Sequence, residues 1–305
     1  MSDEVASTTA ARRMDAPAPI AGLVTVTAWS SAFVGIRAAD QTLSPGALAL
    51  GRLVVSTAIL GGFALARREP LPRRRDLLAI AAYGIAFLGV YSATLNAAER
   101  LVDAGTAAMI INTGPLLITL FAGIFLREGF PRGLLAGCAV AFAGCVVIGL
   151  ATIQNGARPG LGIVLCMVAV LAYSAAVVVQ KPVLARVSPF QVTWLGCVAG
   201  AIACLPFTPA FVTEAAKAGP AAIGWTIYLG SVPTALGFTT WAFALRRASA
   251  GRTASLNYLI PVVAIVLGWA VLGQKPLWLA IAGGALCLLG VYFARRRAAN
   301  DKGAA

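Results

Sequence analysis

The chain of 305 residues contains no histidine, and none of its 11 acidic residues lies in the middle of an apolar run. Histidine is the commonest general base and a common metal ligand, so its absence disfavours an enzyme active site and a metal site. A carboxylate in the middle of an apolar run is the usual proton relay of proteins that move protons. We therefore expect no catalytic residues, no bound metal, no cofactor and no dedicated proton relay.

Charged residues are scarce as well. They make up 11% of the chain, against 59% hydrophobic residues, whereas soluble domains average about 25% and about 45–50%. A lipid bilayer solvates this much apolar surface, so the composition predicts a multi-pass membrane protein. The net charge of +13 resides in short basic clusters between apolar runs, which is typical of membrane topology signals and disfavours nucleic-acid binding.

Cysteine is present without the spacing of a metal or disulfide site. The six cysteines all lie inside apolar runs, and no CxxC pair occurs among them. Cysteines in such positions are usually buried free thiols. We expect the same here.

Long apolar runs fill the chain between short polar connections. A helix needs about 20 apolar residues to cross the hydrocarbon core, and the sequence predicts an all-α integral membrane protein with ten such helices. Arg12 and Arg13 before the first run are also typical of a signal peptide, but this run has a counterpart in the second half. The predicted helices span residues 19–38, 45–66, 77–97, 104–126, 133–152, 161–180, 190–211, 221–245, 253–272 and 277–294.

The distribution of lysine and arginine predicts the orientation of these helices. With the N-terminus in the cytoplasm, 18 of the 24 basic residues lie on the inner side, and the other 6 lie outside or in the outer half. Basic residues accumulate on the cytoplasmic side of membrane proteins. We therefore expect cytoplasmic tails at residues 1–18 and 295–305, on a protein of the bacterial inner membrane.

The chain contains an internal repeat. Residues 84–148 align with residues 230–294 without a gap at an offset of 146, and 13 positions are identical where about five are expected by chance. The earlier parts align at an offset of 144. We therefore expect two five-helix units, at residues 19–152 and 161–294. Because five is odd, the second unit is inverted in the membrane. Inverted repeats are typical of secondary transporters, which place the substrate at the repeat interface, and some channels share the plan.

Three motifs resemble a known family. They are GTAAMIINTGPLLITLFAGIFLRE (105–128), its counterpart GRTASLNYLIPVVAIVLGWAVLGQ (251–274), and SPGALALGRL at the start of the second predicted helix. Over about residues 19–294 the chain resembles the EamA-like transporters of the drug/metabolite transporter superfamily. The resemblance implies ten helices, cytoplasmic termini, a central cavity lined by helices 1, 3, 4, 6, 8 and 9, and export or exchange of small metabolites. One departure is Gln274, where the family usually has a glutamate.

Aromatic and polar side chains share faces of several predicted helices at 100° per residue. A cavity walled by rings with a few hydroxyls and amides suits small amphipathic solutes such as amino acids. The alternative is that the rings face lipid or the membrane interface. The candidate cavity residues are Trp29, Ser30, Phe33, Tyr83, Phe87, Tyr91, Asn112, Tyr173, Gln180, Thr234, Phe238, Trp241 and Asn257.

Two prolines occupy matching places in the two units. Pro115 and Pro261 predict kinks within the fourth and ninth helices, where carbonyl groups freed by the proline need partners or water. Asn112 and Asn257 lie on the same faces as these prolines. The kinks either line a cavity or serve packing alone, with the asparagines satisfying the backbone.

Arg52 lies inside the second apolar run, about 10 Å below its predicted outer end. Its long side chain can extend toward the outer interface, near the depth of Arg37. We consider two roles for this arginine. It forms an outer vestibule with Arg37 for a solute carboxylate, or it is a structural arginine paired with Asp40, Glu99 or Asp103.

These features favour a carrier that moves small organic metabolites, amino acids first, by alternating access and without a cofactor. A facilitator or exchanger is favoured over a proton-coupled carrier, although Glu99, Asp103 or Glu128 at a cavity mouth remain candidates for proton binding. The alternatives are a lipid or sugar-lipid flippase of the same fold, an intramembrane enzyme and a non-transporting scaffold. The expected partners are a small-molecule substrate and the lipid bilayer, with no nucleic acid, and the chain is expected to be a monomer or homodimer.

Overall fold

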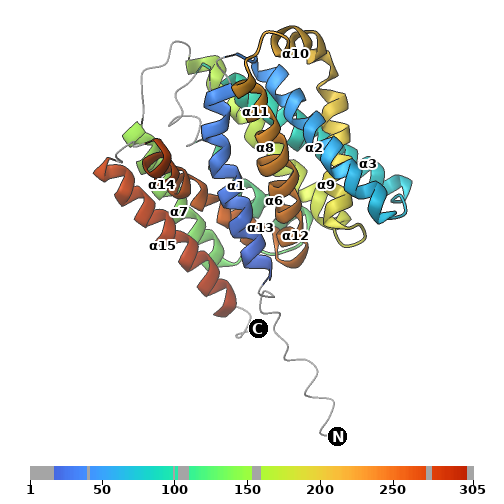
Figure 1. The fold of residues 1–305 in the computed structure, drawn as a ribbon. Coiled ribbons are helices and arrows are strands. Elements are labelled where there is room, and N and C mark those ends of the chain that lie inside the picture. Colours follow the sequence, from blue (N-terminus) through green and yellow to red (C-terminus); the bar gives the residue numbers. More distant parts are fainter. Residues whose placement is uncertain are drawn as a thin grey trace, which may run out of the picture.

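The structure is a computed structural model and describes residues 17–39, 42–98, 100–101, 110–152, 159–272 and 277–300. These residues form helices joined by short turns, and no strand occurs among them (Figure 1). The predicted all-α class is confirmed for this part of the chain.

The first half of the chain forms helices with short connections. Ser44 precedes Pro45, which begins the second helix and fits its first turn because the missing N–H has no partner there anyway. The elements are α1 (Pro17–Ala39), α2 (Pro45–Arg67), α3 (Arg74–Tyr83), the π-helix η1 (Gly84–Val90), α4 (Tyr91–Ala98), α6 (Gly114–Phe125) and α7 (Arg132–Thr152).

The second half follows a similar order. The hydroxyl of Ser188 accepts a hydrogen bond of 3.2 Å from the backbone N–H of Gln191 and so caps the start of α9. The elements are α8 (Pro159–Val183), α9 (Pro189–Ala203), the 3₁₀ turn η2 (Leu205–Phe207), α10 (Thr208–Ala215), α11 (Pro220–Leu229), the π-helix η3 (Gly230–Leu236), α12 (Gly237–Arg247), α13 (Ala250–Ala254), the 3₁₀ segment η4 (Ser255–Leu259), α14 (Ile260–Leu272) and α15 (Trp278–Asn300).

The helix predicted at residues 190–211 is broken. It ends as α9 at Ala203, and the following segment Leu205–Ala215 continues at an angle of 53°. Pro206 and Pro209 explain the break, because proline inside a helix removes a hydrogen bond and clashes with the preceding turn.

Several helices are long and apolar enough to cross a membrane. Among the residues that the structure describes, five meet this test, and a sixth does so if the bent pair is one span. The apolar helices Gly114–Phe125, Arg132–Ile148 and Ile281–Ala294 are shorter. The predicted count of ten spanning helices therefore stays a prediction.

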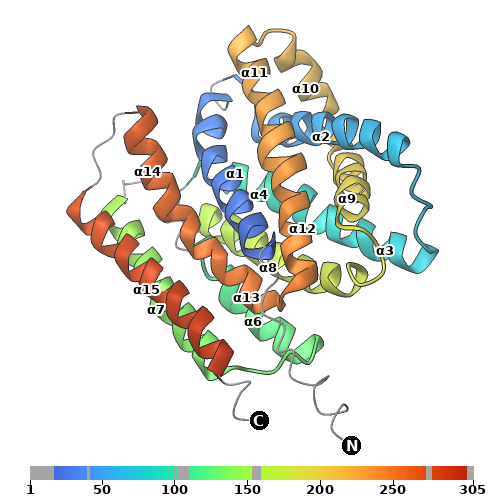
Figure 2. The ribbon, with the colours of Figure 1, turned by 60° about the horizontal axis from the view of Figure 1, so that its bottom comes forward.

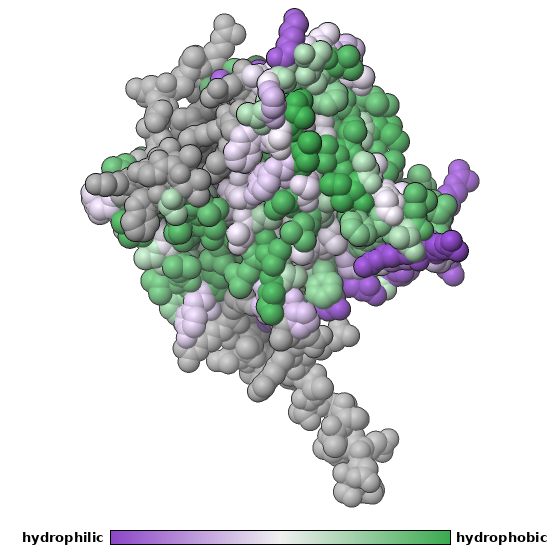
Figure 3. All heavy atoms as spheres, in the orientation of Figure 1, coloured by the Kyte–Doolittle hydropathy of each residue, from purple (hydrophilic) through white to green (hydrophobic). Residues whose placement is uncertain are grey.

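The surface matches a chain solvated by lipid. Apolar side chains cover much of the face in Figure 3, and hydrophilic ones gather at the lower right, where α2 ends and α3 begins. Phe63, Leu65 and Phe125 are 60%, 78% and 70% exposed. Large exposed apolar patches of this kind mark contact with a membrane or a partner.

The last helix of each predicted unit packs against its equivalent. Helices α7 and α15 lie side by side (Figures 1 and 2). A Cβ at Gly144 would come within 2.6 Å of the backbone nitrogen of Cys287, and one at Gly290 within 2.6 Å of the Cβ of Ala141. Ala141 of α7 lies against Gly290 of α15, and Gly144, further along α7, lies against Cys287, which comes earlier on α15. The two helices are therefore antiparallel. Glycine permits this close approach.

A π-helix of seven residues interrupts the same place in both halves. Segment η1 begins at Gly84 and η3 begins at Gly230, two glycines that the 146-residue offset relates. Segment η1 packs on α9, and η3 packs on α2. A Cβ at Gly84 would lie 2.8 Å from the Cα of Gly196, and one at Gly230 would lie 2.8 Å from the carbonyl oxygen of Arg52. Each π-helix therefore crosses the second helix of the other half at close range.

Candidate substrate-binding site

Seven of the predicted cavity residues form one group of rings, which we call the aromatic cluster. Phe87 of η1 lies at its centre, with ring centroids 4.8 Å from Tyr173 and 4.9 Å from Phe238. The rings come from α1, α3, η1, α4, α8 and α12, so both halves contribute. The members are Trp29, Tyr83, Phe87, Tyr91, Tyr173, Phe238 and Trp241.

Most of the aromatic cluster is buried. Tyr83 is 0% exposed and Trp241 is 1% exposed, and Phe87, Tyr173 and Phe238 are each below 5%. These five rings therefore do not face lipid, whereas Trp29 and Tyr91 are half-buried. The rings pack against one another.

Three polar atoms beside the aromatic cluster form no hydrogen bond of full geometry: the hydroxyl of Tyr83, the Nε2 of Gln180 and the Oδ1 of Asn257. The side chains of Tyr83 and Gln180 nevertheless interact with each other. The other ends of both amides are bonded: Gln180 Oε1 accepts from Trp241 Nε1 at 3.3 Å, and Asn257 Nδ2 donates to the hydroxyl of Tyr173 at 2.5 Å. Buried polar groups are normally satisfied, so orphaned ones mark places where water or a ligand binds.

Arg52 lies on α2 at the edge of the cluster and is only 9% exposed. Its Nε donates a hydrogen bond of 2.9 Å to the hydroxyl of Thr234 in η3. Tyr91 and Cys197 lie within electrostatic range of the guanidinium. No carboxylate of the described residues forms an ion pair with it. The proposed partners Asp40, Glu99 and Asp103 lie outside the described residues, as does the side chain of Arg37.

Side chains from α1 and α2 hold the π-helix η3. The hydroxyl of Thr234 donates to the carbonyl oxygen of Leu229, five residues earlier, at 2.7 Å. The indole Nε1 of Trp29 donates to the carbonyl oxygen of Pro233 at 3.1 Å. Trp29 and Arg52 therefore both contact η3 through hydrogen bonds.

Ser30, Asn112, Pro115 and Pro261 do not belong to the ring group. Ser30 donates to the carbonyl oxygen of Ile260 at 3.1 Å and so contacts α14. Asn112 is half-buried in the turn before α6. Pro115 lies in the first turn of α6, after a turn at residues 112–113. Pro261 lies in the first turn of α14, which continues from the 3₁₀ segment η4 within one helical stretch, Ala250–Leu267. Proline fits a first turn better than a helix interior, and the predicted kinks stay a prediction. The side chain of Phe33 lies outside the described part.

Polar bonds at helix ends were missed by the sequence reasoning. The guanidinium of Arg186 donates from Nε to Asp76 at 3.0 Å, and this bond raises the pKa of Arg186 above its ordinary value. Both carboxylate oxygens of Glu128 accept from the backbone N–H of Ala250, at 3.0 and 2.9 Å, at the start of α13. These partners are more than 100 residues apart in sequence, so no local sequence pattern predicts that they are in contact. Glu128, a candidate for proton binding, is engaged here as a helix cap.

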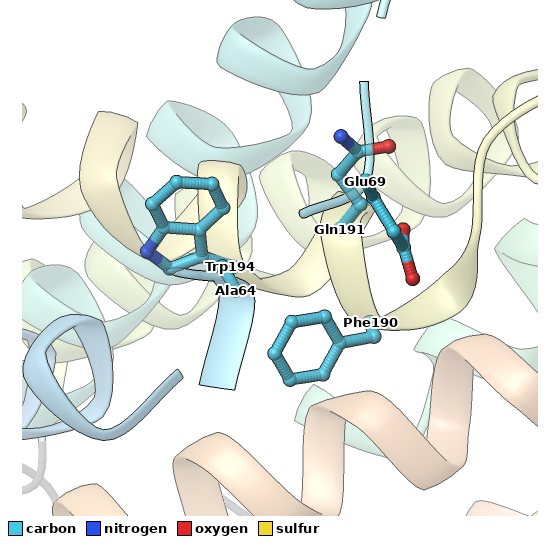
Figure 4. A pocket seen from close by; sticks show the side chains of 5 residues that line it. All are labelled: Ala64, Glu69, Phe190, Gln191 and Trp194. Carbon is cyan, nitrogen blue, oxygen red and sulfur yellow. The ribbon is translucent and has the colours of Figure 1, made fainter. Parts of the chain in front are cut away.

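A small pocket lies between the end of α2 and the start of α9 (Figure 4). Its volume is about 20 Å³, enough for one water molecule but not for an organic solute. It is lined by Ala64, Glu69, Phe190, Gln191 and Trp194. This pocket is separate from the aromatic cluster and is not the predicted substrate site.

The helical fold and the apolar surface define a multi-pass membrane protein. The chain belongs to the EamA-like transporter family, whose sequence model matches residues 16–150 and 160–296. The predicted resemblance to this family is confirmed.

Relatives of known name support the same class. The chain is 38% identical over 275 residues to a probable terminal-alkyne amino-acid exporter of Streptantibioticus cattleyicolor, covering 90% of this chain and 92% of that protein. It is 25% identical to a probable amino-acid metabolite efflux pump of Salmonella typhimurium, with 92% and 97% covered. It is also 26% identical to the uncharacterized inner membrane transporter YedA of Escherichia coli K12, with 83% of each chain covered. A solved crystal structure matches with a TM-score of 0.74 at 21% identity, covering 91% of this chain and 96% of that one. This last match shows the fold alone.

Proposed function

We propose that this protein is an inner-membrane exporter, acting as a facilitator or exchanger, of small organic metabolites, with amino acids as the leading candidates. The observation that carries the proposal is the aromatic cluster, which is mostly buried, contains rings from both halves and is bordered by amide and hydroxyl groups that form no hydrogen bond of full geometry. Rings bind the apolar part of a small solute, and a few polar groups fix its orientation.

The proposed architecture is ten spanning helices in two inverted units, at residues 19–152 and 161–294, with both tails in the cytoplasm. The antiparallel packing of α7 on α15 supports the inversion, because these helices are equivalent in the repeat and inverted copies run in opposite directions. The crossings of η1 with α9 and of η3 with α2 add a second matched pair of contacts. Alternating access then requires one unit to rock against the other, which would separate the rings of the aromatic cluster.

The printed names of two relatives support the substrate class. One is called a probable terminal-alkyne amino-acid exporter and another a probable amino-acid metabolite efflux pump. A terminal alkyne on an amino acid is a short, rigid apolar group, which suits a site walled by aromatic rings. Because the described part of the cluster contains no carboxylate, we favour exchange or facilitated export over proton coupling.

The proposal is tested by reconstituting the purified chain into liposomes. Uptake of labelled L-phenylalanine, L-leucine, a terminal-alkyne amino acid and a fluorescent phospholipid is measured with and without a pH gradient. We expect saturable amino-acid flux that persists without the gradient. Flux of the phospholipid alone would replace the proposal with a flippase, and flux that collapses without the gradient would replace the facilitator with a proton-coupled carrier.

A further inference from the structure

Arg52 breaks the symmetry of the two crossings. In the repeat, Arg52 of α2 is equivalent to Gly196 of α9, and Thr234 of η3 is equivalent to Leu88 of η1. A Cβ at Gly196 would lie 3.3 Å from the side chain of Leu88. One crossing is therefore closed by a glycine and a leucine, and the other by an arginine bonded to a threonine. The apolar pair at the crossing of η1 with α9 shows that a crossing of this kind forms without a charged residue.

The burial of Arg52 demands a compensating partner that the described residues do not provide. A guanidinium has five N–H donors, and only the Nε of Arg52 has a hydrogen-bond acceptor in the described part of the chain. At 9% exposure the side chain has little access to solvent. A charge buried without an opposite charge is unfavourable, and in a membrane protein such a residue marks a substrate or ion path.

The position of Arg52 places its charge beside the aromatic cluster. Tyr91 lies near the guanidinium, and its ring is 5.4 Å from that of Phe87 and 5.7 Å from that of Tyr173. A small solute with its apolar part against these rings would present a polar end to Arg52. Arginine binds carboxylates with two parallel hydrogen bonds, which adds geometric selectivity to the charge.

We propose that Arg52 binds the carboxylate of the transported solute, so that the substrates are small carboxylates with an apolar side chain. This inference rests on the proposed function and names the substrate class of the same site. The hydroxyl of Thr234 orients the guanidinium through its Nε and leaves the terminal nitrogens for the ligand.

The experiment measures binding and flux separately, in the wild type and in R52Q and R52K. Binding of L-phenylalanine and of phenylethylamine, which lacks the carboxylate, is measured by titration in phosphatidylcholine nanodiscs. We expect R52Q to weaken L-phenylalanine binding about 30-fold or more, R52K to weaken it less, and neither to weaken the binding of phenylethylamine, a cation that the charge of Arg52 does not attract. The control is R67Q, because Arg67 is an exposed arginine at the far end of the same helix, and this variant should bind like the wild type.

A second measurement needs no variant and applies even if R52Q fails to fold. The arginine reagent phenylglyoxal is added to the wild type, and modification of Arg52 is followed by mass spectrometry. We expect L-phenylalanine to protect Arg52 and phenylethylamine not to. Equal modification at saturating L-phenylalanine would overturn the inference. Protection by phosphatidylglycerol nanodiscs without any amino acid would assign the site to a lipid headgroup and would also overturn it.

The two readouts separate this inference from the proposed function. Binding of L-phenylalanine that depends on Arg52, without flux into liposomes, would keep the carboxylate site and refute export. Flux that is unchanged in R52Q would keep export and refute the carboxylate site. A wild type that binds neither L-phenylalanine nor L-leucine would refute the carboxylate site as well.

Discussion

At the residue scale, Phe87 connects the two halves of the molecule. Its ring contacts those of Trp29, Tyr83, Tyr91, Tyr173 and Phe238. Aromatic pairs contribute about 0.5–1.5 kcal/mol each beyond the area that they bury. The packing of this one side chain therefore contributes to the contact between the two halves.

We predict that Phe87→Leu lowers the free energy of unfolding by about 1–3 kcal/mol, because it keeps most of the volume but loses the ring pairs. It should also lower amino-acid flux about tenfold, the equivalent of about 1.4 kcal/mol of binding. The measurements are thermal unfolding in detergent and liposome uptake. Phe63→Leu is the control, because Phe63 is 60% exposed on the outer surface of α2. Equal effects of the two changes would contradict a central role for Phe87.

Gln180 lies at the polar edge of the aromatic cluster. Its Oε1 accepts a hydrogen bond from the indole Nε1 of Trp241, and its Nε2 lies by the hydroxyl of Tyr83 without a hydrogen bond of full geometry. We predict that Gln180→Met lowers the free energy of unfolding by about 1–3 kcal/mol, because the buried Nε1 of Trp241 loses its acceptor. The same change should lower amino-acid flux, because a polar contact to the solute is lost. Normal flux in a folded Gln180→Met protein would remove Gln180 from the site.

The sequence predicted most of the aromatic cluster but not its state. Periodicity placed the seven rings on shared helix faces, and the structure brings them together. It could not predict that the rings close on one another, because ring contacts between helices far apart in sequence depend on how the two halves pack. The partner of Arg52 was missed for the same reason, since Thr234 is 182 residues away.

At the element scale, the two π-helices are the least regular parts of long helices. Single π-helical turns inside α-helices occur frequently at functional sites. Segments η1 and η3 each carry residues of the site, Phe87 and Thr234, and each crosses a helix of the other half. A change in helical winding at these segments would move the site residues and the crossing together.

We predict that Gly84→Ala destabilises the protein by about 1–3 kcal/mol, because the added methyl would lie 2.8 Å from the Cα of Gly196. Gly62→Ala in α2 is the matched control: nothing lies within 4 Å of its new methyl group. Alanine forms helix better than glycine, so the control should raise stability by up to about 1 kcal/mol. Thermal unfolding of both variants measures the difference, and a Gly84→Ala protein as stable as the control would contradict the close crossing.

The sequence predicted the presence of helices better than the residues at which they begin, end or change their winding. The repeat aligned Gly84 with Gly230, and these glycines begin the two π-helices. Hydropathy carries no signal for a π-helix, because one extra residue in a turn leaves the segment as apolar as before. Pro115 and Pro261 marked places where the helical winding changes, but the sequence analysis did not predict the break at Pro206.

At the scale of the whole molecule, the pairing of α7 with α15 reports on the relation of the two halves. Cys145 and Cys287 face each other across this pair, with their sulfur atoms 3.6 Å apart, and both are free thiols. A disulfide needs an approach to about 2.05 Å. We predict that mild oxidation with copper phenanthroline joins these two cysteines, as detected by mass spectrometry of the digested chain.

Cys138 is the internal control for this crosslink, because it lies on the same helix α7 and is also buried and free. It should remain unpaired under the same conditions. A crosslink of Cys145 to any other cysteine, or none to Cys287 after Cys145 has been oxidised, would contradict the antiparallel register of α7 and α15.

The number of spans is where the sequence and the structure agree least. Apolar runs predicted ten spanning helices, whereas the described residues contain five of sufficient length and a bent pair. The difference arises partly where a helix is broken, as between α9 and α10, and partly where predicted helices extend beyond the described residues, as before α6. Hydropathy averages over such breaks, so it predicts the presence of an apolar segment better than its continuity.

Counterflow tests the central claim of alternating access most directly. Liposomes that contain the protein are loaded with unlabelled L-phenylalanine or left empty, and the initial uptake of labelled L-phenylalanine is compared. A carrier that alternates between the two faces of the membrane turns back to the outer face faster with solute bound than when it is empty. The account therefore predicts faster uptake into the liposomes that contain unlabelled L-phenylalanine. Equal uptake into loaded and empty liposomes would contradict exchange through a site that opens to one side at a time.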